Sequence, residues 1–245
     1  MIAAAFDKLA GQYDALWTCS AVGRLQREAS WRAIDPLFLP GDSVLDLGCG
    51  TGEDALHLMA GGVAVQGIDI SPEMVRIARA RGVNARALPV EALGQLRGRF
   101  DGAISNFGAL NCVPRLEPVA EALGSLIRPG GRVALCLMGR CCVRETCHYL
   151  RRRRARKAFR RWRPGGSHSS IGVQVSYPSI HSLANALRRD FELDHWRGIG
   201  LFVPPSYVDV PERTLARLAA IDRRIAGLPL LRALADHRLL VFIRR

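Results

Sequence analysis

The sequence lacks any apolar run long enough to cross a bilayer, which takes about 20 consecutive apolar residues. Its first residues, Met1–Asp7, also lack the basic and then apolar plan of a secretion signal. We therefore expect a cytoplasmic protein. At 245 residues, 49% of them hydrophobic, the chain is long enough to bury the core of one sizeable α/β domain.

The cysteines show no disulfide framework. They are odd in number, seven, and irregularly spaced, which favours reduced thiols. Cys141, Cys142, Cys147 and His148 lie close together in the sequence, but adjacent cysteines followed by a four-residue gap are not a usual zinc pattern. The sequence therefore predicts free thiols and no bound metal.

Lysine is nearly absent: only Lys8 and Lys157 occur, although the formal net charge is +13. Nine arginine or lysine residues and no acid lie between Arg151 and Arg163, and subtracting these nine from +13 leaves only +4 for the rest of the chain. The basic charge is thus a local feature, and it does not by itself indicate a nucleic-acid-binding protein.

Three glycines at alternate positions follow an apolar stretch in Val44–Gly52, which reads VLDLGCGTG. This pattern is typical of a buried parallel strand that ends in a tight turn whose backbone approaches a ligand. Glu53–Met59 looks like the start of the next helix, whose first amide groups face back towards the turn. The pattern predicts a cofactor cradle.

Strands and helices alternate after the breaker Pro40–Gly41. Such alternation implies a parallel sheet covered by helices on both faces. Ser71 followed by Pro72 is a strong helix start. The expected strands are 44–47, 63–68, 84–87, 100–105, 133–137, 173–177, 191–196 and 239–243, and the expected helices start near residues 52, 71, 117, 179 and 214.

Two further segments have helical spacing. Residues 1–40 look helical, with one face formed by Phe6, Leu9, Tyr13 and Leu16. From Arg140 to Trp162, apolar residues again follow helical spacing while arginines occupy the other face, which predicts a single amphipathic helix.

Asp69 directly follows the apolar stretch Val63–Ile68, 21 positions after Gly48. A carboxylate there can accept hydrogen bonds from both hydroxyls of a ribose. The alternative, that it caps the next helix, is weaker because Ser71 already supplies a cap. Glu53 stands where a dinucleotide fingerprint needs its third glycine. With Asp46 it would repel a pyrophosphate and suit a cofactor that carries a positive sulfonium and ammonium.

Between residues 6 and 140 the chain resembles the small-molecule branch of the class I S-adenosylmethionine (SAM)-dependent methyltransferases. The resemblance implies an α/β, Rossmann-like, doubly wound, seven-stranded and mostly parallel sheet with an inserted helical cap. It rests on Val44–Gly52, Gly67–Met74, Phe100–Asn106 and Leu126–Val133, and on Phe6–Asp14, which looks like the helix that lies over the methionine part of the cofactor.

The resemblance implies that SAM is the cofactor, that Asp69 holds its ribose and that Ile70 and Met74 pack on its adenine. The family commonly has an acidic residue after the third strand for the adenine amine, whereas this chain has Val90 and then Glu91. Either a backbone carbonyl or Glu91 takes that role. The expected cofactor-binding residues are Tyr13, Asp46, Gly48, Cys49, Gly50, Gly52, Asp69, Ile70, Met74, Val90, Glu91 and Asn106.

We expect one methyltransferase domain over residues 1–245. Its parts would be an N-terminal helical lid (1–40), a SAM-binding core (41–139), an Arg-rich cap insertion (140–178) and a C-terminal segment (179–245) that completes the sheet with a helical excursion. The oligomeric state stays open.

Methyl transfer from a sulfonium is an in-line displacement, so alignment and desolvation supply much of the acceleration. The acceptor often still has to lose a proton. Candidate bases are His195, Tyr177 and above all His148 and His181, each with a structural role as the alternative. Asn106 would point towards the transferred methyl or the methionine carboxylate.

Four interpretations of Arg151–Arg163 stay open: a solvated helix face, docking on an anionic membrane, an acidic or phosphate-bearing acceptor, and RNA. The favoured function is methyl transfer to a small-molecule or lipid-like acceptor. An RNA methyltransferase and a SAM-binding protein without turnover are the alternatives. The first two motifs show no degradation, which favours an enzyme, and no RNA-reading module accompanies them.

Overall fold

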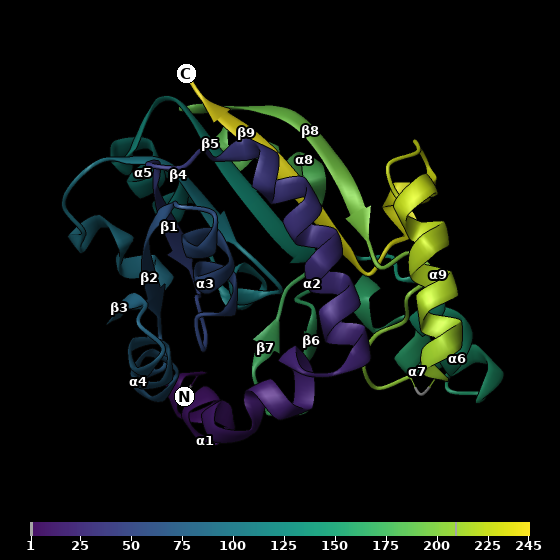
Figure 1. Ribbon diagram of the computed structural model, residues 1–245. Coiled ribbons are helices and arrows are strands. Elements are labelled where there is room, and N and C mark those ends of the chain that lie inside the picture. Colours follow the sequence, from purple (N-terminus) through teal and green to yellow (C-terminus); the bar gives the residue numbers. More distant parts are fainter. Residues whose placement is uncertain (1, 209) are drawn as a thin grey trace.

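The computed structural model describes residues 2–208 and 210–245. A seven-stranded sheet with the order β3-β2-β1-β4-β5-β9-β8 forms its centre (Figure 1). Five strands run parallel: β1 (Ser43–Leu47), β2 (Ala64–Asp69), β3 (Asn84–Ala87), β4 (Phe100–Ser105) and β5 (Ile127–Met138). Strand β9 (His237–Arg244) is antiparallel to both of its neighbours, β5 and β8 (Phe191–Ile199). The predicted doubly wound, mostly parallel sheet of seven strands is confirmed.

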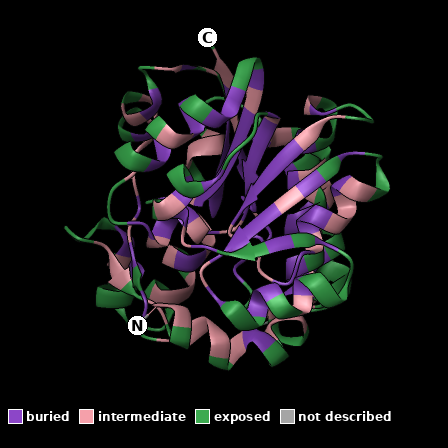
Figure 2. Ribbon diagram, turned by 90° about the vertical axis from the view of Figure 1, so that its left-hand side faces the viewer, coloured by how far each residue is buried: buried purple, intermediate pink, exposed green. Residues whose placement is uncertain are grey.

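Helices cover both faces of this sheet (Figure 1). One face packs against α2 (Ala21–Ile34), α3 (Glu53–Ala60) and α4 (Pro72–Ala80). The other packs against α5 (Glu117–Leu126) and α8 (Ile180–Leu187). Side chains of β1 alternate between the two layers, Val44 joining the first core cluster and Leu45 the second. The central strands β1 and β4 are accordingly almost wholly buried, whereas the edge strands β3 and β8 are partly exposed (Figure 2).

The strand order reverses between β1 and β4, which lie side by side. In open α/β sheets the crevice beyond the carboxyl ends of the strands at such a reversal is where ligands bind. The glycine turn of residues 48–52 follows β1 at this place. Because β9 is antiparallel, it begins at this edge, where His237 pairs with Met138 at the end of β5.

The helix predicted at Ser71 is confirmed, and the N-terminal helix departs from the pattern. The hydroxyl of Ser71 accepts a hydrogen bond from the Met74 amide and caps α4. Helix α1 (Ile2–Tyr13) passes into one turn of π-helix, Asp14–Thr18. The wider turn rotates the following residues, so Leu16 is 59% exposed and leaves the face predicted for it.

The single helix predicted from Arg140 to Trp162 is wrong. The segment forms α6 (Val143–Arg151), α7 (Ala155–Ala158) and a 3₁₀ turn, Arg160–Trp162, with Arg153 at a φ of +56° between the first two. A continuous helix would hold residues 16 positions apart at about 24 Å. The buried ion pair between Glu145 and Arg161, 16 positions apart, requires the chain to fold back.

The rest of the C-terminal half completes the sheet and adds a small helical layer. The strand expected at 173–177 shortens to β7 (Gln174–Val175) and pairs with β6 (Ser167–His168) outside the main sheet. Helix α9 (Glu212–Ile225) packs on α2 through Leu215, Ala219 and Val22. None of the helices in the described residues combines the length and the apolar character needed to span a bilayer.

Candidate active site

The glycine turn is held at the end of β2. The Gly48 and Cys49 amides both donate to the Ile68 carbonyl, at 2.8 and 2.9 Å. Gly48 has a φ of +77°, and a Cβ on it would lie 2.2 Å from that of Ala109. Only glycine fits there, because a side chain would be strained and would collide with the loop after β4.

Asp69 stands at the end of β2 between the glycine turn and α4. Its Oδ2 accepts from the Gly50 amide at 2.9 Å and its Oδ1 from the Ser71 amide at 2.8 Å. Burial raises the pKa of Asp69, while these amides act in the opposite direction. Each carboxylate oxygen has a second lone pair, so the group is oriented by the backbone and can still accept from two ribose hydroxyls.

Helix α1 and the π-turn close over the turn and α4 through two acids. The Ser71 hydroxyl donates to Asp7 at 2.6 Å. The Thr51 hydroxyl donates to Asp14 at 2.7 Å. These contacts join the N-terminal segment to the start of α4 and to the glycine turn.

These parts enclose a cavity of about 260 Å³, the cofactor cavity. It is lined by nine of the twelve expected cofactor-binding residues: Tyr13, Gly48, Gly50, Asp69, Ile70, Met74, Val90, Glu91 and Asn106. Cys49 and Asp46 are buried beside the turn, and Gly52 is the N-cap of α3 with a φ of +88°. Burial of Tyr13 raises its pKa to about 12, so its hydroxyl stays protonated near neutral pH.

Asp46 is a buried acid with an oxygen that lacks a hydrogen-bond partner among the described residues. No residue in the described ranges forms a hydrogen bond with its Oδ2 atom. Burial and the nearby Asp54 raise its pKa well above the ordinary value. Glu53, in contrast, is paired with Arg81 at 2.5 Å. The orphaned oxygen of Asp46, the oriented carboxylate of Asp69 and the apolar walls fit a ligand that combines a positive amino-acid part, a ribose and an adenine.

Asn106 lines the cofactor cavity, but its amide is engaged with the protein. Its Oδ1 accepts from the Ser30 hydroxyl at 2.9 Å, and its Nδ2 donates to Asp54 at 3.1 Å. Asp54 also forms a buried ion pair with Arg27. The structure therefore places the Asn106 amide in a network that fastens α2 and α3 to the end of β4.

Neither candidate base lies at the cofactor cavity. His148 is half-buried on α6, and His181 is exposed on α8. His195 is exposed on β8. Tyr177 is buried, and its hydroxyl lies 2.9 Å from the Ser167 hydroxyl. None of these four side chains is among the described residues that line the cofactor cavity.

Sequence reasoning missed Asp236 and His237. A second cavity, of about 240 Å³, contains both residues and shares Tyr13, Phe107 and Met138 with the cofactor cavity. One signal could have found them: an acid and a histidine stand directly before the last expected strand. If that strand is antiparallel, its first residues lie at the cofactor edge of the sheet.

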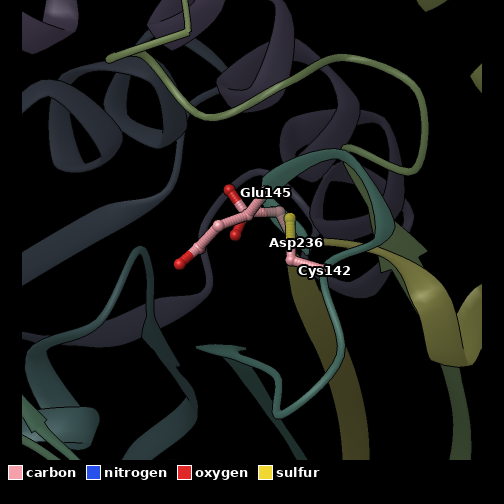
Figure 3. A group of neighbouring side chains, drawn as sticks. All are labelled: Cys142, Glu145 and Asp236. Atoms are coloured by element: carbon pink, nitrogen blue, oxygen red, sulfur yellow. The ribbon is translucent and has the colours of Figure 1, made fainter. Parts of the chain in front are cut away.

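Cys142, Glu145 and Asp236 converge in a buried group that resembles a metal site (Figure 3). Arg161 donates to Glu145 Oε2 at 2.8 Å and to Asp236 Oδ1 at 2.7 Å. Arg160 also pairs with Glu145, so two guanidinium groups face the two carboxylates and the group is an internal ion-pair network, which we call the Arg161 network. The other members of the sequence cluster lie outside it: Cys141, Cys147 and His148.

Comparison with known proteins adds to this geometry. Residues 44–131 match the model of a family described as a methyltransferase domain. Residues 44–131 thus belong to a methyltransferase domain. The matched range runs from β1 through the glycine turn and Asp69 to the start of β5, so it holds most of the expected cofactor-binding residues.

Curated relatives of this methyltransferase domain include enzymes of quinone biosynthesis. A demethylmenaquinone methyltransferase of Clavibacter sepedonicus is 31% identical over 147 residues, covering 55% of this chain and 57% of that protein. A ubiquinone/menaquinone biosynthesis C-methyltransferase of Geotalea daltonii is 31% identical over 144 residues, covering 53% and 60%. The chain spans a little over half the length of these relatives.

Solved structures share the fold over the whole chain. A possible histamine N-methyltransferase of Thermotoga maritima superposes with a TM-score of 0.63 at 15% identity and full coverage of both chains. The 1,6-didemethyltoxoflavin-N1-methyltransferase of Burkholderia thailandensis, solved with S-adenosylhomocysteine, gives 0.59 at 23% identity, covering 100% of this chain and 87% of that one. These likenesses support the fold of the methyltransferase domain.

Proposed function

We propose that this protein transfers a methyl group from SAM to a small, lipid-like acceptor. One observation carries the proposal: a single cavity at the strand-order reversal gathers nine residues that the sequence motifs assign to SAM. The quinone methyltransferases among the relatives support a lipid-like acceptor, because their names specify isoprenoid quinones.

Bound SAM would supply a methyl group activated by its positive sulfur. Asp69 would hold the ribose hydroxyls, and Ile70 and Met74 would pack on the adenine. Asp46 would favour the positive end of the cofactor electrostatically. The lid, held by Asp7 and Asp14, would exclude water from the reacting atoms. The protein's contribution is then alignment and desolvation.

Replacing Asp69 tests the cofactor site. Asp69→Ala should abolish SAM binding measured by calorimetry, because the variant loses both ribose acceptors. Asp194→Ala is the matched control, since Asp194 is an exposed acid on β8. Unchanged affinity in Asp69→Ala would exclude this cofactor site.

Turnover is tested separately, with extracts incubated with isotope-labelled SAM and analysed by mass spectrometry. We expect a labelled lipid-like molecule in the presence of the wild-type protein. Tightly bound SAM with no labelled product across a broad acceptor screen would favour a SAM-binding protein without turnover. Label in RNA would favour the RNA methyltransferase.

We also propose that the exposed part of Arg151–Arg163 docks on an anionic membrane surface. Arg160 and Arg161 turn inward to Glu145, whereas the other seven basic residues of the segment are exposed. Phe159 and Trp162, which are 50% and 58% exposed, stand among them. Basic residues combined with exposed aromatic side chains are typical of interfacial contacts, and a membrane is where a lipid-like acceptor is found.

Vesicle co-sedimentation tests the docking surface. Vesicles with phosphatidylglycerol should bind the protein in low salt, and pure phosphatidylcholine vesicles should not. Changing Arg151–Arg154 to glutamine should reduce binding at least tenfold. The same change at Arg213, Arg217, Arg223 and Arg224 of α9 removes equal charge and should have little effect. Equal losses of vesicle binding in the two variants, or no binding of the wild-type protein at low salt, would indicate that Arg151–Arg163 is only a solvent-exposed surface.

A further inference from the structure

The second cavity adjoins the cofactor cavity on the side away from Asp69. Tyr13, Phe107 and Met138 line both. Asp69 and the adenine walls line only the first, while Trp17, Tyr207 and His237 are found only in the second. A ligand in the second cavity would therefore border the cofactor cavity where these three side chains meet, which is where an acceptor has to approach the methyl group.

Aromatic side chains form much of the second cavity. The ring centroids of Trp17 and Phe107 lie 4.7 Å apart. The rings of Phe107 and His237 meet edge to face, with 5.2 Å between their centroids. Phe107 has a φ of +52°, a strained conformation that the loop maintains where the two cavities meet. Such walls suit a planar ring, because aromatic groups gain from offset and edge-to-face contacts.

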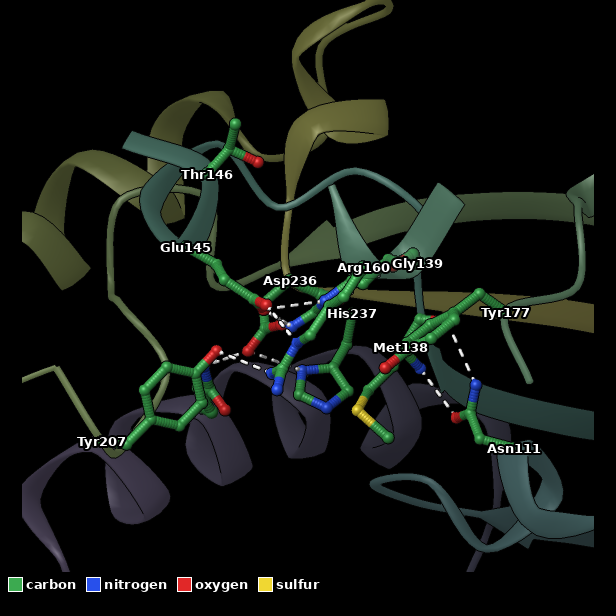
Figure 4. Close-up of polar contacts among 12 residues, drawn as sticks. Asn111, Met138, Gly139, Glu145, Thr146, Arg160, Tyr177, Tyr207, Asp236 and His237 are labelled. Atoms are coloured by element: carbon green, nitrogen blue, oxygen red, sulfur yellow. Dashed lines mark hydrogen bonds and ion pairs between the residues drawn. The ribbon is translucent and has the colours of Figure 1, made fainter. Parts of the chain in front are cut away.

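His237 supplies an imidazole to the wall of this cavity, and Asp236 lies beside it (Figure 4). The His237 Nδ1 atom lies 3.5 Å from Asp236 Oδ2, longer than an ordinary hydrogen bond but within reach of a small adjustment on binding. Asp236 is itself held by Arg161 and by Gln26. A proton on Nδ1 directed at this carboxylate leaves the lone pair on Nε2.

The surroundings keep His237 neutral. Burial lowers its pKa, Asp236 acts in the opposite direction, and Arg161 lowers it further. Arg160, Tyr207 and Tyr13 are the other charged or titratable groups of the cavity. A neutral imidazole can accept a proton, and the neighbouring guanidinium groups favour a negative charge on the ligand.

We propose that the second cavity binds an acceptor with a hydroxylated aromatic ring, and that His237 Nε2 takes the proton of its hydroxyl group. This inference rests on the proposed function, since the cofactor cavity must hold SAM for the acceptor to react. It replaces His148 and His181 as the base.

The step balances as follows. The hydroxyl proton moves to Nε2, which becomes positively charged beside Asp236. The electron pair of the acceptor oxygen forms the new O–C bond to the methyl carbon while the S–C bond breaks and its electron pair stays on sulfur. The imidazolium then returns its proton to water. His237 is thus a catalytic residue, and Asp236 is a positioning residue.

The chain offers a matched control for this pair. Asp194 and His195 also form an Asp–His pair, with 2.9 Å between Asp194 Oδ2 and His195 Nδ1, but both are exposed on β8. His195 and His237 therefore each lie beside an aspartate. What distinguishes His237 is its place in the aromatic cavity next to the cofactor.

The test uses the full chain loaded with S-adenosylhomocysteine and 4-nitrocatechol, a hydroxylated ring whose absorbance reports its ionisation. At a pH where the free probe is mostly protonated, the wild-type protein should bind it as the phenolate. His237→Gln should lose at least nine-tenths of this absorbance change, and His195→Gln should keep it. An unchanged signal in His237→Gln, or no binding of the probe to the wild-type protein, would overturn the proposal.

Calorimetry with S-adenosylhomocysteine separates this inference from the proposed function. His237→Gln should bind it with wild-type affinity, because His237 lies outside the cofactor cavity. A wild-type protein that fails to bind it contradicts the proposed function itself. If His237→Gln does not fold, diethyl pyrocarbonate labelling of the wild-type protein decides: the probe should protect His237 at least fivefold and leave His195 unprotected. Equal labelling of His237 with and without probe would overturn the proposal.

Discussion

The cofactor side and the acceptor side of this molecule are built in different ways. Most of the cofactor cavity is placed by backbone features within residues 43–138, namely a glycine turn, a strand end and a helix cap, each of which depends on only a few neighbouring residues. The acceptor side depends on the Arg161 network, in which Glu145, Arg161 and Asp236 come from distant parts of the chain. Short motifs can specify the first arrangement, whereas only tertiary folding assembles the second.

The two sides also differ in electrostatics. Burial raises the pKa values of Asp46 and Asp69 beside the cofactor cavity. Burial alone would raise that of Asp236 as well, but Arg161, together with His237 and Gln26, outweighs it and leaves the pKa below its ordinary value. Ionisation of Asp46 and Asp69 is thus costly without a ligand and would be favoured by a positive one, while the carboxylates of the acceptor side are already paired with arginine.

The largest effect is expected from removing the internal cation. Arg161→Met removes the cation that two buried carboxylates, Glu145 and Asp236, share, and should lower the free energy of unfolding by about 3–5 kcal/mol. Arg163→Met, at an exposed position of the same segment, should change it by less than about 0.5 kcal/mol. Urea denaturation measures both. Equal small losses would show that the network contributes little and would weaken the contrast between the two sides.

Removing the charge of Asp46 is expected to stabilise the ligand-free protein, in contrast to the loss expected for Arg161→Met. Because its folded-state pKa is raised, the protonated form contributes stability that is present below the unfolded pKa of about 3.9 and is lost as pH rises through the folded pKa. Asp46→Asn has no such loss, so at neutral pH it should raise the melting temperature of the ligand-free protein. It should also weaken S-adenosylhomocysteine binding about tenfold, or about 1.4 kcal/mol.

Melting curves recorded with and without S-adenosylhomocysteine measure both effects of Asp46→Asn. Asp42→Asn serves as the control, since Asp42 is a partly exposed acid before β1 that accepts from the Leu39 amide. A lower melting temperature for ligand-free Asp46→Asn would contradict the interpretation that burial of Asp46 destabilises the ligand-free protein at neutral pH.

The smallest effect concerns the break between α6 and α7. Arg153 has a left-handed backbone, which costs a residue with a side chain about 1 kcal/mol relative to glycine. Arg153→Gly should therefore raise the free energy of unfolding by up to about 1 kcal/mol, measured by urea denaturation. Arg156→Gly, at an exposed position inside α7, should lower it by a similar amount. A lower free energy of unfolding in Arg153→Gly would contradict a left-handed backbone at this position.

Much of the fold could be predicted because strand and helix signals are local. The strands 84–87 and 100–105 agree with the structure residue for residue. The helix from 140 to 162 could not be predicted correctly, since its spacing is helical throughout and only the distant Asp236 shows why Arg161 must turn inward. His237 was missed for a similar reason: its position follows from the antiparallel direction of β9, which no nearby residue indicates.

The sequence by itself determined the class of fold, the glycine turn and the place of Asp69, because each depends on backbone conformations that neighbouring residues impose. Only the tertiary structure decided which histidine lies near the cofactor cavity and which arginines are exposed. Those outcomes depend on ion pairs and hydrogen bonds between residues as many as 210 positions apart, such as Gln26 and Asp236. Contacts over such separations leave no periodic pattern in the sequence.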